Sequence, residues 1–273
     1  MSSQIKSNYF TYRGVNLEDY NFMLCSVGSN SDDTFVNGLS KSLNEEEGVN
    51  GLKTLISTSF DYQDFEVQII KCLPNGDLLS FNESDMFFLN SLLFNCSGYQ
   101  ALEYDGLVIN CIFTKSNTYM NSSEQGYLTL TIHCEPYQKS NQINETVVVT
   151  GSIAKEIILE NKSNVGDFLE LTEVIVELDS TATSILLENK TTGKQFYMSG
   201  LTTTDKKSFT IYGENFHYIK SDVDADINMW TSLDSIKNSF ISLCYGVNRI
   251  GITTNGTGLS TITFKYQCKV QYQ

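Results

Sequence analysis

The side chains most often used in catalysis are few in this sequence and stand apart along it. Its two histidines, His133 and His217, have no companion at the spacing of a zinc site. The sequence contains no Gly-x-Ser-x-Gly elbow, no P-loop and no glycine-rich phosphate fingerprint, and its seven cysteines give no nucleophile signature. These residues predict neither an enzyme nor a metal or cofactor site, and we expect His133 to lie on the face of a strand.

Two acidic stretches imitate functional sites without completing them. Residues 222–228 begin like a calcium-binding loop, but Ile227 stands where that loop needs glycine, and Leu233 stands where it needs glutamate. We expect these carboxylates to alternate along the exposed face of a strand. The three glutamates at 45–47 are adjacent and cannot all face one substrate, so they predict a solvated loop. No pair of acids stands out for glycoside hydrolysis.

Composition indicates a globular protein that does not bind nucleic acid. The 273 residues are enough for two domains, and 41% hydrophobic with 18% charged residues is typical of folded chains. The 18 basic and 32 acidic residues give a net charge of -14. A phosphate backbone requires clustered basic side chains, so this balance favours solubility or a basic partner.

The sequence also predicts where the chain is made. Residues 1–6 lead into no apolar core, so no signal peptide is expected, and no apolar run approaches the roughly 20 residues that cross a bilayer. The cysteines are odd in number and sit mostly among apolar residues, as at Cys111, which predicts reduced buried thiols and a reducing cytoplasm. Seven Asn-x-Ser/Thr triplets are expected by chance rather than as glycosylation sites; they begin at Asn82, Asn95, Asn121, Asn144, Asn161, Asn189 and Asn255.

Pro136, one of only two prolines, divides the chain near its midpoint. A strand-like alternation ends at Cys134, and a new apolar run begins at Thr146 after a polar segment. Because proline lacks a backbone donor, it suits the exit from a strand. We expect Glu135, Pro136 and Tyr137 to form a hinge between two domains, at residues 1–137 and 138–273.

The first half reads as strands around one helix. Residues 60–73 alternate like one long strand, with a bulge suggested at 63–64. Asn82 and the acids that follow it predict the start of a helix that runs to about Cys96. Strands return after Gly98, which indicates a β-sandwich or barrel-like domain packed with one α-helix.

A long polar segment at 28–51 interrupts the first half. Such a loop is either a solvated surface or an extended arm that reaches a neighbouring subunit. The candidate arm residues are Asp32, Asp33, Phe35, Glu45, Glu46 and Glu47.

The second half shows short apolar runs separated by turn residues, including a run at 238–243. Turn signals recur at Gly193, Gly213, Gly246 and Gly256. This spacing predicts an antiparallel β-sandwich with no helix. The fold class is therefore mainly β in both domains.

The order of these features resembles the distal tail protein family of phages that infect Gram-positive bacteria, the hub between tail tube and baseplate. In the first half, the motifs that carry the resemblance are Phe-Thr-Tyr-Arg-Gly at 10–14, the helix and following strand at 84–104, and Glu-Pro-Tyr at 135–137. In the second half they are Asn-x-Thr-x-Gly at 189–193, a strand at 209–213, Phe-x-x-Leu-x-x-Gly-x-Asn at 240–248 and a closing strand at 261–266. Tyr212 and Glu135 stand where the family often has other residues, and residues 28–51 are less similar.

The resemblance implies a structural protein of the virion, at the distal end of the tail. It implies a ring of six copies formed by the first domain, with a galectin-like or carbohydrate-module-like sandwich as the second domain. The partners would be further copies of the chain, the tail tube protein, a baseplate hub protein, and a receptor-binding protein or cell-wall saccharide. An acidic lumen would repel passing DNA.

Two other functions stay open on the residues alone. The second domain could be an adhesin module that binds cell-surface saccharide, with Tyr212, Trp230 and Tyr245 as candidate stacking side chains. A glycosidase or esterase acting on the cell wall has the least support from the sequence.

Overall fold

The computed structural model describes residues 8–25, 41–47, 53–104, 106–166, 168–213 and 217–270. Contacts within the chain define two compact units; the first ends at Ser140, and the second spans Asn141–Val270. Strands dominate both units, and the described residues contain one α-helix, so the mainly-β prediction is confirmed. No helix in these ranges is long and apolar enough to cross a membrane.

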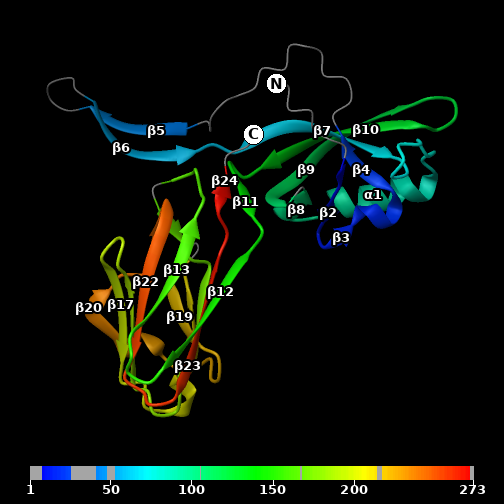
Figure 1. Cartoon of the computed structure of the whole chain (residues 1–273). Coiled ribbons are helices and arrows are strands. Elements are labelled where there is room, and N and C mark those ends of the chain that lie inside the picture. The colour runs from blue at the N-terminus through cyan, green and yellow to red at the C-terminus, as the bar shows by residue number, and fades with distance from the viewer. Residues whose placement is uncertain are drawn as a thin grey trace. The chain divides into compact units, whose positions relative to one another are not determined.

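The first unit is built on one antiparallel sheet with a helix beside it (Figure 1). Neighbouring strands follow the order β1-β4-β7-β10-β9-β8-β2-β3. Only Phe10 separates β1 from β2 along the chain, although they lie toward opposite ends of this order. The two ends of the sheet must therefore approach each other, which gives the barrel-like curl. The strands are β1 (Asn8–Tyr9), β2 (Thr11–Tyr12), β3 (Val15–Asn16), β4 (Phe22–Cys25), β5 (Lys41–Glu47), β6 (Lys53–Phe60), β7 (Gln63–Lys71), β8 (Gln100–Tyr104), β9 (Leu107–Met120), β10 (Gly126–Cys134) and β11 (Gln138–Ser140).

The predicted helix is α1 (Glu83–Phe94), and its start is confirmed. Asn82 accepts a hydrogen bond from the backbone N–H of Asp85, whose carboxylate accepts one from the N–H of Asn82, which completes a capping box. Leu89, Leu92 and Leu93 of α1 are buried in the core of the first unit. The 3-10 turn η1 (Leu17–Tyr20) also contacts α1, through stacked rings of Tyr20 and Phe88 at 4.3 Å.

The second unit is a sandwich of two antiparallel sheets, as the sequence predicts. One sheet has the order β12-β23-β15-β18-β19 and the other β13-β22-β16-β17-β20, with β14 and β21 paired separately. The core between them is apolar and draws on both sheets. The strands are β12 (Ile143–Thr150), β13 (Lys155–Asn161), β14 (Phe168–Glu170), β15 (Glu173–Glu177), β16 (Ser184–Asn189), β17 (Lys194–Ser199), β18 (Ser208–Tyr212), β19 (Tyr218–Ser221), β20 (Leu233–Asn238), β21 (Ser242–Cys244), β22 (Gly246–Thr254), β23 (Leu259–Tyr266) and β24 (Lys269–Val270), and the 3-10 turns are η2 (Thr204–Lys206) and η3 (Met229–Ser232).

One loop prediction and one strand prediction in the first unit are wrong. The solvated loop expected at the glutamates 45–47 is the end of β5, which pairs with β6 as a hairpin. The single strand expected over 60–73 is divided, because β6 ends at Phe60 and β7 begins at Gln63. Tyr62 lies in this break and is half exposed rather than buried.

Two predictions in the second unit are also wrong. Residues 222–228 form bends after β19, not a strand, because their polar side chains bond locally; Asp224 Oδ1, for example, accepts from the N–H of Asp226. The strand expected over 238–243 is interrupted between β20 and β21.

Candidate functional site

The hairpin β5–β6 carries the described part of the predicted arm. Glu45 and Glu46 are exposed on β5, and Glu45 pairs with Lys53 across the hairpin at 3.3 Å. Glu47 is the last residue of β5. Asp32, Asp33 and Phe35 lie outside the described residues.

Three large apolar side chains of this hairpin face solvent. Leu43, Leu55 and Ile56 are each more than half exposed. Ile56 is a bulge, because Asn44 opposes Ser57 and Glu45 opposes Leu55, which leaves Ile56 without an opposing residue. Within the described ranges β5 and β6 pair only with each other. The hairpin thus presents apolar surface that its own unit leaves uncovered.

A second exposed surface of the first unit is an aromatic patch formed by Tyr62, Tyr99 and His133. The rings of Tyr62 and His133 are stacked with centroids 5.4 Å apart, and Tyr99 lies 5.4 Å from Tyr62. His133 Nδ1 also contacts Asp64 Oδ1 at 2.6 Å. His133 therefore lies on a strand face, as predicted, and takes part in a surface that a partner could cover.

The predicted hinge residues lie inside the first unit. Glu135 is held to β9, since its N–H donates to Asn110 O at 2.9 Å and its Oε2 accepts from Asn110 Nδ2 at 3.0 Å. Pro136 is buried in the bend between β10 and β11, next to Tyr137. The chain leaves this unit only after Ser140. The bend at Pro136 is a strand exit, and the boundary between the units follows it.

The second unit contains a cavity of about 300 Å³. Its apolar lining includes Leu171, Val174 and Ile211, whereas Glu170, Lys194, His217 and Ser242 supply polar atoms, and Phe240 adds a ring. Small-ligand pockets are concave, mostly apolar and carry a few convergent polar groups, so this cavity has the composition of a binding site.

Polar contacts fix the side chains of the cavity. Lys194 Nζ donates to Ser242 Oγ at 2.9 Å and lies over the exposed ring of Phe168 at 4.9 Å. His217 Nε2 lies 3.2 Å from Glu170 Oε1, and the His217 ring is stacked on Phe240 at 4.4 Å. Strands β14, β17 and β21, together with the segments before β19 and before β21, therefore hold one group of polar and aromatic side chains.

The three predicted stacking residues occupy different surroundings. Trp230 in η3 is half exposed, and its ring lies 6.2 Å from that of Phe240. Tyr212 is stacked on Tyr218 at 4.2 Å, and burial together with the neighbouring Tyr218 raises the pKa of Tyr212. Tyr245 stands on the turn between β21 and β22 and is 72% exposed. Of the three, only Trp230 contacts a ring of the cavity.

A network of buried asparagines supports this region, and sequence reasoning missed it. Asn189 and Asn248 are fully buried, and Asn189 Nδ2 donates to Asn248 Oδ1 at 3.1 Å and to Ser242 O at 2.8 Å. Asn161 Nδ2 donates to Leu243 O at 3.1 Å. The amides therefore supply hydrogen-bond donors to backbone carbonyl groups of β21.

The signal for this network was present in the sequence as Asn-x-Ser/Thr triplets. Asn161 Oδ1 accepts from the N–H of Ser163, and Asn189 Oδ1 accepts from the N–H of Thr191. In both cases the triplet is an Asx turn, in which the side chain caps the backbone two residues on. Only the recurrence of this triplet at the ends of strands could have indicated the asparagine network.

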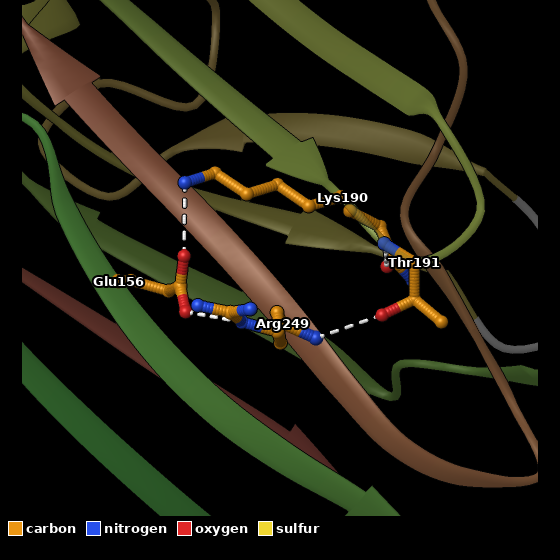
Figure 2. A network of polar contacts seen from close by, with 5 residues as sticks. Glu156, Lys190, Thr191 and Arg249 are labelled. Carbon is orange, nitrogen blue, oxygen red and sulfur yellow. Dashed lines mark hydrogen bonds and ion pairs between the residues drawn. The ribbon is translucent and has the colours of Figure 1, made fainter.

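The outer face of β13 and β22 carries a charged network, drawn in Figure 2. Glu156 accepts from Lys190 Nζ at 2.9 Å and from Arg249 Nε at 2.6 Å, and Thr191 Oγ1 accepts from the N–H of Arg249 at 3.1 Å. Hydrogen bonds from Lys190 and Arg249 hold the pKa of Glu156 below its ordinary value. This network joins β13 and β22 to the turn that follows β16.

Neither metal nor thiol chemistry is supported by the described residues. They contain no cluster of three or more histidine, cysteine, aspartate or glutamate side chains that could hold a metal ion. Five of the seven cysteines are buried, as the sequence predicts. Burial raises the pKa of Cys25 to about 11, which keeps its thiol protonated and unreactive.

Comparison with known proteins identifies the first unit and the fold of the whole chain. Residues 5–136 match the family model of the phage tail protein N-terminal domain. No curated protein matches the sequence. The crystal structure of the Dit protein of phage SPP1, described as a paradigm of the hub adsorption apparatus in phages infecting Gram-positive bacteria, is 15% identical, covers 95% of this chain and 98% of its own, and superposes with a TM-score of 0.58. The activated baseplate of phage P2 with Ca is 10% identical over 96% and 98% of the two chains, with a TM-score of 0.46.

The first half of the chain is therefore a phage tail protein domain, and the whole chain shares its fold with the SPP1 hub protein. The resemblance to distal tail proteins that the sequence indicates is confirmed. The match of residues 5–136 and the shared fold both relate the chain to phage tail proteins.

Proposed function

We propose that this chain, whose first half is a phage tail protein domain, is a distal tail hub protein. Six copies form a ring that joins the tail tube to the baseplate. The observation that carries this proposal is the hairpin β5–β6, which exposes Leu43, Leu55 and Ile56. An isolated two-stranded hairpin is marginally stable in water, and exposed apolar clusters mark interaction sites. A neighbouring copy that covers the hairpin would stabilise its two strands and bury its apolar side chains.

The aromatic patch provides the complementary surface. A ring needs a head-to-tail contact, in which one surface of a copy meets a different surface of the next. The hairpin and the patch of Tyr62, Tyr99 and His133 are two such surfaces on the same unit. We assign the hairpin as the arm and the patch as the surface that receives it.

The partners follow from this role. One face of the ring meets the tail tube protein, and the other meets a baseplate hub protein. The acidic balance of -14 suits a lumen that DNA passes without binding. The buried cysteines fit synthesis in the reducing cytoplasm of the bacterial host, with assembly at the distal end of the tail.

Light scattering of the purified full chain, with negative-stain microscopy, tests the proposal. We expect a mass six times that of the chain and a ring with a central hole. Ile56→Asp places a charge in the apolar contact and should lower the mass. The matched control is Ile153→Asp, which changes an isoleucine of the second unit that is 76% exposed. The assignment of the hairpin as the arm would be contradicted if the unmodified chain were monomeric, or if the two variants had equal masses.

A further inference from the structure

We propose that the cavity of the second unit binds one neutral hexose ring, an activity beyond that of the tail hub. The cavity holds about 300 Å³, at the lower end of the roughly 300–1,000 Å³ of small-ligand pockets. That volume admits a single ring rather than a longer oligosaccharide. The side chains that line the cavity determine the class of ligand.

The polar side chains of the cavity combine donors with acceptors. Glu170 offers carboxylate oxygens, and Lys194 carries three N–H donors, of which Ser242 Oγ takes one. Ser242 is opposite Glu170 in the β14–β21 pair, so these groups lie on adjacent strands. Sugar hydroxyls both donate and accept, and this mixture suits them.

Aromatic and apolar surfaces complete the match. The His217–Phe240 stack, with rings 4.4 Å apart and 11° from parallel, lines the cavity, and the His217 side chain is 42% exposed. Leu171 and Ile211 supply apolar lining. A hexose ring has an apolar C–H face with hydroxyls at its rim, and it can cover these surfaces while its hydroxyls reach Glu170 and Lys194.

Other ligand classes fit the cavity less well. A purely hydrocarbon ligand would remove Glu170 and Lys194 from water and leave them only their existing contacts with His217 and Ser242, which is costly. A phosphate or nucleotide would meet the carboxylate of Glu170, with Lys194 as the one lysine or arginine in the lining. No metal-binding cluster occurs among the described side chains. A neutral sugar is the class that uses both charged groups.

Fluorescence of Trp230 tests this assignment, because it is the single tryptophan of the chain and lies beside Phe240. The full chain is titrated separately with glucose, galactose and N-acetylglucosamine, and saturation-transfer NMR checks each sugar. At least one sugar should give a saturable change with millimolar affinity. Glu170→Gln and Lys194→Met should each weaken binding at least tenfold.

Glu160→Gln is the matched control, since Glu160 is an exposed glutamate of the same unit with one ion-pair partner, Lys162 at 3.1 Å. It should bind like the unmodified chain, and thermal melts confirm that all variants are folded. No saturable signal with any of the three sugars would overturn the assignment. Unchanged binding in both cavity variants would overturn it as well. The mass of the ring is measured in parallel. A failure to bind sugar therefore leaves the hub proposal to be tested separately.

Discussion

Replacing Asn248 by alanine should destabilise the second unit more than any exposed substitution in it. The Asn248 side chain accepts from the N–H of Cys244 at 3.0 Å and from Asn189 Nδ2 at 3.1 Å, and it donates to Cys244 O at 2.8 Å and Gly246 O at 3.1 Å. A net ~1 kcal/mol per hydrogen bond gives a loss of about 4 kcal/mol in the free energy of unfolding.

That loss is large against the 5–15 kcal/mol typical of whole domains, so the variant should fold but unfold at clearly lower denaturant. Urea denaturation followed by the fluorescence of Trp230 reports on the second unit, because the single tryptophan lies there. The transition should keep its slope and shift its midpoint, since the surface exposed on unfolding is nearly unchanged.

Two further asparagines provide a graded comparison. Asn161→Ala removes the bonds to Leu243 O and Ser163 N–H and should cost about 2 kcal/mol. Asn144→Ala, at an exposed position, should change stability by no more than about 0.5 kcal/mol. The reasoning is refuted if Asn248→Ala costs under about 1 kcal/mol, or if Asn161→Ala costs more than Asn248→Ala.

Three other substitutions test separate parts of the fold. Asn82→Ala removes the capping box of α1 and should lower the stability of the first unit by about 1 kcal/mol in urea denaturation followed by circular dichroism; an unchanged midpoint would contradict the cap. Gly213→Ala places a methyl group 2.3 Å from Leu171 O and should cost about 1–3 kcal/mol by Trp230 fluorescence. Gly98→Ala in the first unit meets no atom within 4 Å and needs no left-handed φ, so it should not lower the stability measured by circular dichroism. Glu156 has a pKa below its ordinary value of 4.5, so its stabilising contribution is present above that value and is lost as pH falls through the lower folded value. The urea midpoint of the unmodified chain should therefore fall more steeply than that of Glu156→Gln between about pH 5 and pH 3, and parallel curves would exclude the contribution.

The elements with a strong local signal could be predicted from the sequence. The α1 helix was predicted because Asn82 and Asp85 specify its start whatever surrounds them. The sandwich followed from alternation, since a strand such as β23 buries every second residue. Each of these signals depends on neighbours along the chain.

The parts of the structure that could not be predicted depend on residues far apart in the sequence, or show no pattern in the sequence at all. The β5 strand has exposed residues at each position whose side chain is described, so no alternation marks it. The cavity is lined by residues spread from Glu170 to Ser242, and no spacing in the sequence shows that Lys194 and Ser242 meet. The aromatic patch likewise requires that Tyr62, in the break between β6 and β7, lies beside His133 on β10.

The buried asparagines explain why the resemblance could be found through short polar motifs. The Asn-x-Thr-x-Gly motif contributes Asn189, the Phe-x-x-Leu-x-x-Gly-x-Asn motif contributes Asn248, and the two side chains bond each other at 3.1 Å. An apolar core residue can be exchanged for another of similar volume at small cost. A buried amide that satisfies several backbone groups has no such substitute, because its loss leaves those groups without partners. Short polar motifs built on buried asparagines therefore carry a sequence signal that the exchangeable apolar core does not.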